Sequence, residues 1–247
     1  MLGERGENVS LVTVKRALSD MAERGILIAG GSGRSSSYQI SLLGRIFSDI
    51  DARSYCAMEP DRRHGQKRYN QDLFAGIPGV IFSSGELQRL EDATAEYTRR
   101  TTDLPPAIEK RELERLVIEL SWKSSKIEGN TYTLLDTEKL ILENKEASGH
   151  AHSEAQMILN HKDAFNFVRL NARSFKKLSR AHIEELHAIL VKDLNVGAGL
   201  RKRVVGIVGS LYQPLDNQHQ VREGLEALAA AVARVQTPYG KALVALL

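Results

Sequence analysis

The chain has 247 residues, which is enough for one large domain or two modest ones. Apolar residues make up 42% and charged residues 26%, as in ordinary globular proteins, and a net charge of +3 is too small to indicate nucleic-acid binding by itself. The single Cys56 excludes an internal disulfide, and no apolar run approaches the length of a membrane span. Composition therefore predicts a cytoplasmic protein with no membrane partner.

The first predicted element is a helix that begins at Ser10, its candidate N-cap, and ends near Arg24. Val14, Leu18 and Met21 follow one another at spacings of four and three, so they share one helix face. The sequence therefore predicts an amphipathic helix with one apolar side.

Two short strands are predicted after this helix, over residues 26–29 and 37–40, with a glycine-rich turn that contains Arg34 between them. Helix, strand, basic turn and strand in this order resemble the second half of a winged helix-turn-helix domain. In that family the helix enters the major groove and the turn, or wing, touches the DNA backbone or minor groove. The residues that the resemblance implies as DNA contacts are Thr13, Lys15, Arg16 and Arg34.

Residues 1–45 are thus predicted to form a partial winged-helix module, with DNA as a candidate partner. A structural or homodimerising module is the alternative, because many winged helices bind proteins. The small excess of positive charge in this segment and the few residues before its helix also favour that alternative.

Residues 46–105 are predicted to be a connector with one helix. That helix begins at Ser83 or Ser84 as N-cap and is broken before Pro105. Residues 61–68 are strongly basic, but their acidic neighbours and scarce aromatics favour a solvated linker over a nucleic-acid patch.

Helical patterns dominate residues 106–247, which are predicted to form one domain. The predicted helices cover residues 108–123, a segment starting at Thr133, residues 154–170, 180–191 and 220–235, and a segment starting at Pro238. A β-like run at residues 204–208 is the exception and predicts a hairpin together with residues 210–212. The predicted fold class is mainly α, with two small β-hairpins.

Residues 124–130, S-S-K-I-E-G-N, follow the first of these helices. A spacing of four places Ser124 and Glu128 on one helix face, and Gly129 is a helix breaker. Because the helix dipole disfavours a carboxylate in the last turn, Glu128 is expected to have a partner outside the helix. A solvated glutamate before a C-cap glycine is the common alternative for so short a motif.

Two segments downstream resemble the core of the Fic (filamentation induced by cAMP) family. E-A-Q-M-I-L-N at residues 154–160, followed by Ala164, matches the helix that opens this core. Leu186 and His187, with G-L-R at residues 199–201, match its H…G-x-x-R region.

Two further segments are similar to regulatory and target-binding parts of the same family. Residues 205–214 look like its flap, a β-hairpin before the active site, and Ser124-x-x-x-Glu128-Gly129 matches its inhibitory motif, (S/T)-x-x-x-E-(G/N). The resemblance covers residues 106–247 and implies a Fic-type helical domain.

The resemblance implies a protein adenylyltransferase that moves AMP from ATP, with Mg²⁺, to a Ser, Thr or Tyr hydroxyl of a target protein. Ser124, Glu128 and Gly129 would be inhibitory, with the Glu128 carboxylate pairing to an arginine of the catalytic signature. The flap would align the target as an added strand, and an ordinary structural hairpin is the alternative. The flap residues are Val205, Gly206, Ile207, Val208, Gly209, Ser210, Leu211 and Tyr212.

The catalytic signature of the Fic family, H-P-F-x-(D/E)-G-N-G-R-x-x-R, is absent from the chain. No catalytic or metal-binding residue is therefore predicted, and the chain is expected to be inactive and to bind neither ATP nor Mg²⁺ tightly. Both ends are interpreted as cut from a longer protein. The alternative function is a winged-helix DNA-binding regulator, or an antitoxin-like binding protein, with a non-catalytic Fic scaffold.

Overall fold

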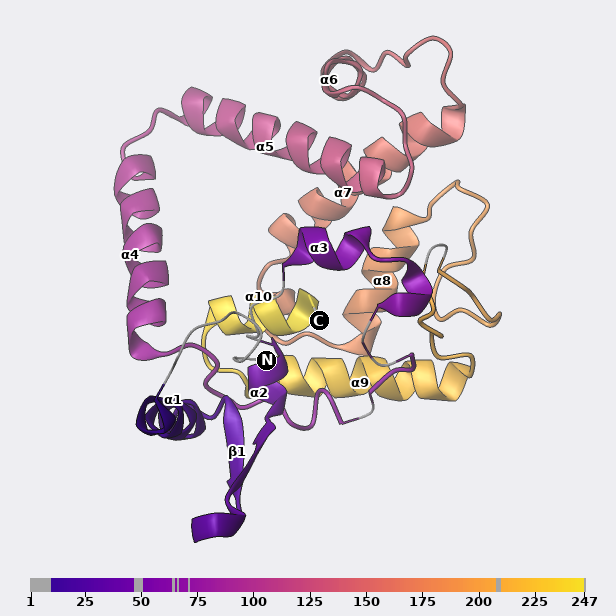
Figure 1. The fold of residues 1–247 in the computed structure, drawn as a ribbon. Coiled ribbons are helices and arrows are strands. Elements are labelled where there is room, and N and C mark those ends of the chain that lie inside the picture. Colours follow the sequence, from indigo (N-terminus) through magenta and orange to yellow (C-terminus); the bar gives the residue numbers. More distant parts are fainter. Residues whose placement is uncertain are drawn as a thin grey trace. The chain divides into compact units, whose positions relative to one another are not determined.

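A computed structural model describes residues 10–46, 51–63, 65, 67–70, 72–207 and 210–246, without the side chains of Arg34 and Asp61. In this part of the chain it contains ten α-helices and one two-stranded antiparallel sheet (Figure 1). The prediction of a mainly α protein is therefore confirmed.

The chain divides into two compact units. Met1–Ile81 and Gly206–Pro214 form the first unit, and Phe82–Val205 and Leu215–Leu247 form the second. The expected boundary at residue 45 thus falls inside the first unit.

The first unit begins with the predicted helix. Helix α1 (Leu11–Glu23) is capped by Ser10, whose hydroxyl accepts a hydrogen bond of 3.2 Å from the Thr13 N–H. Strands β1 (Leu27–Gly30) and β2 (Ser37–Ile40) follow as an antiparallel pair, with Leu27 opposite Ile40. The order of helix, strand, turn and strand is as predicted, and the first strand begins one residue later than expected.

Two glycines allow the close approaches on which this small sheet depends. Gly31 has φ +72° after β1, and a Cβ atom there would lie 2.2 Å from the Ser35 carbonyl oxygen. Gly44 is buried in α2 (Leu42–Ile46), where a Cβ would lie 2.2 Å from the Ile26 carbonyl oxygen. Only a residue without a side chain lets α2 pack this tightly against the backbone that leads into β1.

The rest of the first unit is irregular, with short helical turns. Asp51 caps α3 (Ala52–Ala57) by accepting from the N–H groups of Arg53 and Ser54, and a 3₁₀ turn, Pro60–Arg62, follows. Phe74 and Ile77 are its buried apolar residues, at 5% and 4% exposure. A core this small leaves several apolar side chains of the unit exposed.

The second unit consists of helices. They are α4 (Ser84–Thr101), α5 (Pro106–Ile127), α6 (Leu134–Glu143), α7 (His152–Leu170), α8 (Arg180–Leu190), α9 (Gln218–Arg234) and α10 (Pro238–Leu246). Each predicted helix is present, with ends within a few residues of those expected. Ser83 is the N-cap of α4, where its hydroxyl and the Glu86 side chain form a reciprocal capping box.

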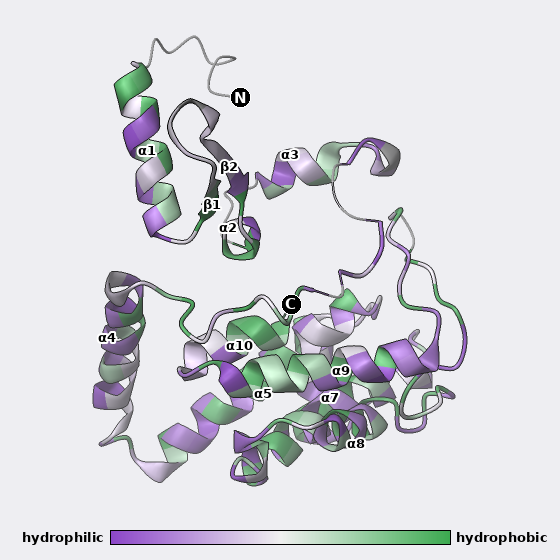
Figure 2. Cartoon of the chain, turned by 90° about the horizontal axis from the view of Figure 1, so that it is seen from below, coloured by the Kyte–Doolittle hydropathy of each residue, from purple (hydrophilic) through white to green (hydrophobic). Residues whose placement is uncertain are grey.

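The core of this unit lies where α6 and α7 meet the loop after α5. Tyr132, Leu140, Ala155 and Ile158 form a buried cluster there, each with 3% exposure or less. Helices α9 and α10 pack on each other around other apolar residues, including the fully buried Val244. Figure 2 shows how hydrophobic and hydrophilic residues alternate along these helices, as amphipathic helices require.

A buried asparagine joins α7 to the end of α8. Asn160 is 1% exposed, and its amide donates to the carbonyl oxygens of Leu190 at 3.0 Å and Lys192 at 2.7 Å. Its own oxygen accepts from the Gln156 amide at 2.8 Å. The side chain therefore satisfies two carbonyl groups that the end of α8 leaves free.

None of the helices in the described ranges combines the length and the apolar character that crossing a membrane requires.

Candidate functional site

Helix α5 ends within the predicted inhibitory motif (Figure 1). Ser124 lies in its last turn, Glu128 is the C-cap residue, and Gly129 has φ +92°, a conformation that favours glycine. Ser124 is half-buried, whereas Glu128 is exposed. The Glu128 carboxylate makes no hydrogen bond or ion pair with any residue that the structure describes.

The two residues after the motif are fixed to the start of α7. Asn130 is 7% exposed, and its amide donates to the Glu154 carbonyl oxygen at 2.7 Å while its oxygen accepts from the Tyr132 N–H at 3.0 Å. The Thr131 N–H and hydroxyl donate to the Glu154 carboxylate at 2.8 and 2.7 Å. The position of Glu128 is therefore set from both sides, by α5 before it and by α7 after it.

The Glu154 carboxylate holds this junction together. It also accepts from the Ala151 N–H at 3.1 Å, as the capping residue in the first turn of α7. The Thr131 hydroxyl, with the N–H groups of Thr131 and Ala151, lowers the pKa of Glu154 to about 2. The group is consequently an anion at neutral pH, which also suits the positive end of the helix dipole.

An aromatic cluster supports the same junction. The Thr131 hydroxyl oxygen lies 2.9 Å from His150 Nδ1, and the rings of His150 and Tyr132 have centroids 4.6 Å apart. The Tyr132 carbonyl accepts from the Trp122 indole N–H at 3.0 Å, and burial raises the pKa of the Tyr132 phenol. These contacts attach the loop between α5 and α6 to Trp122 of α5 and to His150.

Sequence reasoning missed the roles of Thr131, His150 and Glu154. One local signal was present, because Glu154 stands three residues after Ala151, at the position that a capping box reserves for Glu or Gln. The bonds from Thr131 cross 23 residues of sequence and have no local signature.

The charge of Glu128 acts on His161 of α7. Burial lowers the pKa of His161, and the Glu128 carboxylate acts in the opposite direction. Burial is the larger influence, so this histidine is neutral at pH 7.

The segments that resemble the Fic H…G-x-x-R region are in contact. His187 of α8 accepts a hydrogen bond through Nδ1 from the Gly199 N–H at 3.2 Å. Arg201 donates from one terminal nitrogen to the Leu215 carbonyl oxygen, while its buried Nε has no partner among the described residues. His187 and Gly199, which are twelve positions apart and belong to the same sequence motif, are thus in contact in the structure.

The predicted flap hairpin is not formed as strands in the described residues. Residues 204–207 and 210–212 have no strand, and Val208 and Gly209 lie outside the described residues. Glycines at positions 206 and 209 disfavour regular pairing, and the Ser210 N–H closes a turn onto the Ile207 carbonyl oxygen at 3.2 Å. The expectation of a second β-hairpin is corrected accordingly, and target binding by these residues stays a prediction.

The end of this segment pairs with another part of the first unit. The Gln213 N–H donates to the Lys67 carbonyl oxygen at 2.7 Å, and Gln213 forms an isolated parallel bridge with Arg68. Val205, Ile207 and Leu211 are exposed, at 43%, 52% and 40%. Apolar side chains are therefore available on the segment, although its backbone is not arranged as the motif predicts.

Of the residues predicted to contact DNA, one already takes part in the cap of α1. The Thr13 hydroxyl lies 2.9 Å from the Ser10 hydroxyl as part of the helix cap. Lys15 and Arg16 are exposed and make no ion pair with a described residue. Arg34 lies in a short 3₁₀ turn, Gly33–Ser35, and its side chain lies outside the described residues.

In the described part of the chain, no three His, Cys, Asp or Glu residues are grouped so that they could hold a metal ion. Comparisons of the chain with protein-family models, with curated proteins and with solved structures found no match.

Proposed function

We propose that the second unit is part of a Fic-type protein adenylyltransferase whose inhibitory segment is residues 124–129. One observation carries this proposal: α5 ends at the motif with an exposed Glu128 carboxylate, and the following loop is hydrogen-bonded to α7. Helix α7 contains the E-A-Q-M-I-L-N segment that resembles the opening helix of the Fic core. An inhibitory carboxylate needs this rigid connection to the core helix.

In the proposed mechanism, Glu128 pairs with an arginine of the catalytic signature and blocks the productive pose of the ATP γ-phosphate. Ser124, one turn earlier on the same helix, helps to fix the inhibitory end of α5. The hydrogen bonds of Asn130 and Thr131 to Glu154 keep that end from moving away from α7. No step is assigned to Mg²⁺, because the resemblance places its ligand in the catalytic signature, which this sequence does not contain. The proposed compartment is the cytoplasm, which supplies ATP and whose reducing conditions suit a chain with a single cysteine.

The DNA that follows codon 247 of the gene gives the first test. A stretch that encodes H-P-F-x-(D/E)-G-N-G-R supports the proposal. Its absence in every reading frame removes the enzymatic function.

The second test concerns inhibition by Glu128. In protein expressed from the complete gene, Glu128→Ala is expected to raise self-labelling by ATP carrying a radioactive α-phosphate, since the arginine is released. Glu138→Ala is the matched control, because Glu138 is also an exposed carboxylate but lies on α6. Equal labelling of wild type and Glu128→Ala, with an active Fic enzyme as positive control, contradicts the inhibitory role.

DNA binding by the first unit is a second candidate function, favoured by the helix, strand, turn and strand of α1, β1 and β2. Lys15→Glu with Arg16→Glu is expected to weaken binding to promoter DNA by tenfold or more in a polarisation assay at low salt, because two phosphate contacts are lost. Lys110→Glu with Lys139→Glu, an equal charge change in the second unit, serves as control. An unchanged affinity of the α1 variant leaves the unit with a structural or dimerising role.

A further inference from the structure

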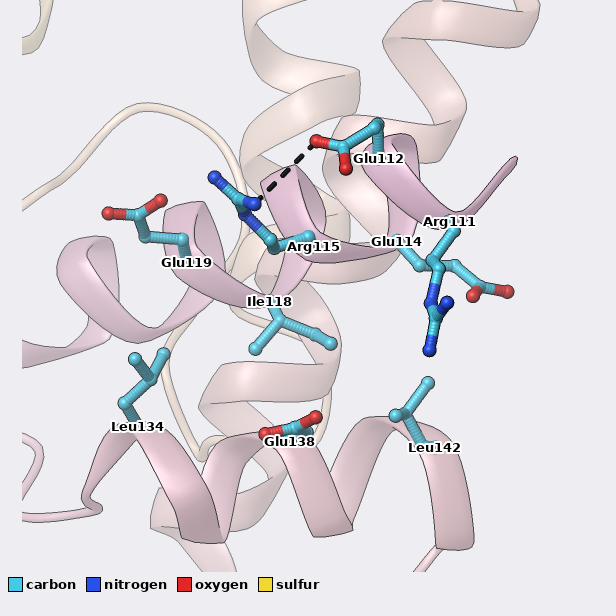
Figure 3. Close-up of a pocket in the computed structure, with 9 residues that line it drawn as sticks. All are labelled: Arg111, Glu112, Glu114, Arg115, Ile118, Glu119, Leu134, Glu138 and Leu142. Atoms are coloured by element: carbon cyan, nitrogen blue, oxygen red, sulfur yellow. Dashed lines mark ion pairs between the residues drawn. The ribbon is translucent and has the colours of Figure 1, made fainter. Parts of the chain in front are cut away.

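Two hollows lie beside α5 in the second unit. The larger one, of about 670 Å³, lies between α5 and α6 and is shown in Figure 3. The smaller one, of about 300 Å³, is lined by residues of α5, α6 and α7. The two share Glu114 and Leu142, so they are neighbours on one surface.

The hollows differ in charge. The larger is lined by four carboxylates, including Glu112, Glu119 and Glu138, and two arginines, with Glu112 and Arg115 in an ion pair of 3.8 Å. The smaller is lined by three cations and one carboxylate, Glu114. Only the smaller one therefore has an excess of positive charge.

Cations and apolar side chains both line the smaller hollow. Lys162 and Arg169 lie seven residues apart on α7 and share a helix face with Asn166 between them. The apolar lining includes the half-buried Leu113 and the buried Val117 of α5. This combination offers an apolar wall for one part of a ligand and cationic donors for another.

Within the described residues, the positive charge at this hollow is only partly compensated. Lys162 and Arg169 make no ion pair with any residue in the described ranges, and Lys162 is half-buried. The Lys110 ammonium is 3.9 Å from the Glu114 carboxylate, the limit of an ion pair, and is 78% exposed. Two cations at the hollow thus lack a counter-charge.

We propose that this hollow binds a small anion with an apolar body, such as a medium-chain carboxylate or phosphate monoester. Lys162 and Arg169 would bind the anionic head, with the Asn166 amide as a neutral donor, while the tail would lie on Leu113 and Val117. The volume is at the lower end of the about 300–1,000 Å³ typical of ligand pockets, which favours a short tail. This site is separate from the inhibitory motif and does not depend on the proposed transferase activity.

Calorimetric titration of the full chain tests the ligand chemistry with four probes that each contain eight carbons: octanoate, octyl phosphate, octanol and octylammonium. We expect the two anions to bind with saturable 1:1 heats that weaken as salt rises, because the head group is held by charge. Octanol and octylammonium are expected to bind at least tenfold more weakly. Equal binding of octanol and octanoate, or no binding of either anion, overturns the proposal.

A charge-neutralising variant tests the location. Lys162→Gln with Arg169→Gln is expected to weaken octanoate binding at least tenfold, whereas Arg111→Gln with Arg115→Gln, in the larger hollow, leaves it unchanged. Circular dichroism checks that both variants are folded. If the first is not, amide NMR of the wild-type chain decides: shifts on octanoate addition at Leu113, Lys162 and Arg169 support the site, and shifts confined to other helices reject it.

Discussion

At the scale of single residues, the most informative group is the Glu154 carboxylate. Its three hydrogen bonds from Thr131 and Ala151 join the loop after α5 to the first turn of α7. These bonds are stronger to the ionised form, which is why the pKa of Glu154 is lowered to about 2. The charge of this residue is consequently linked to the stability of the second unit.

The direction in which stability changes with pH follows from the direction of the pKa shift of Glu154. A carboxyl group whose pKa is lower in the folded state stabilises that state above its ordinary pKa, and this contribution is lost as pH falls through the folded value. We expect the urea concentration at the unfolding midpoint of the wild type to decrease as the pH is lowered from about 4.5, the ordinary pKa of a glutamate, to about 2. Glu154→Gln is expected to have a lower midpoint at pH 7 and a smaller loss in that pH window.

Urea titrations at several pH values, followed by far-ultraviolet circular dichroism, measure both quantities. Glu138→Gln is the control, since this exposed carboxylate has no partner among the described residues. Parallel midpoint curves for wild type and Glu154→Gln across the acid range would show that the hydrogen bonds do not contribute as described.

At the scale of elements, local patterns predicted the helices well. The caps at Ser10 and Ser83 and the break at Pro105 lie where residue chemistry requires them, because capping and ring constraints act over a few residues. The hairpin expected near residue 206 was not found in the described residues, and the segment instead ends in a bond from Gln213 to Lys67, which is far away in sequence. Pairings of this kind leave no periodic signal.

In the candidate site, too, the local features were predictable from the sequence and the tertiary contacts were not. The end of α5 at Glu128 and Gly129 followed from the sequence, because both the helix pattern and the glycine are local. The attachment of the next residues to Glu154 did not, and neither did the cationic hollow, because Lys110 and Lys162 come from helices that only tertiary packing brings together.

The contact between α2 and the start of β1 gives a prediction at this scale. Gly44→Ala places a methyl group 2.2 Å from the Ile26 carbonyl oxygen, so one of these backbone segments must move. We expect a loss of about 1–3 kcal/mol in the free energy of unfolding of the first unit, the usual cost of overpacking. Alanine also gains about 1 kcal/mol in a helix, so the net loss is expected toward the lower end of this range.

Gly85→Ala in α4 is the matched control, because nothing lies within 4 Å of the added methyl group. It is expected to be neutral or slightly stabilising in urea unfolding. A Gly44→Ala protein as stable as the wild type would mean that α2 does not lie this close to Ile26.

At the scale of the whole molecule, the division into two units has an energetic consequence. The first unit has a small core with Phe74 and Ile77, whereas the second has buried residues on several helices. Stability per unit rises with the fraction of surface buried, so the two are expected to unfold separately, the first at the lower temperature.

Two substitutions in different units assign the transitions. Asn160→Ala leaves the carbonyl groups of Leu190 and Lys192 without their donor, at a cost of about 1–3 kcal/mol to the second unit. In calorimetry, Gly44→Ala is expected to lower only the first transition and Asn160→Ala only the second, and the double variant should show both shifts, because distant sites add. One transition that both substitutions lower together would instead show that the chain unfolds as a single cooperative body, with its two units thermodynamically inseparable.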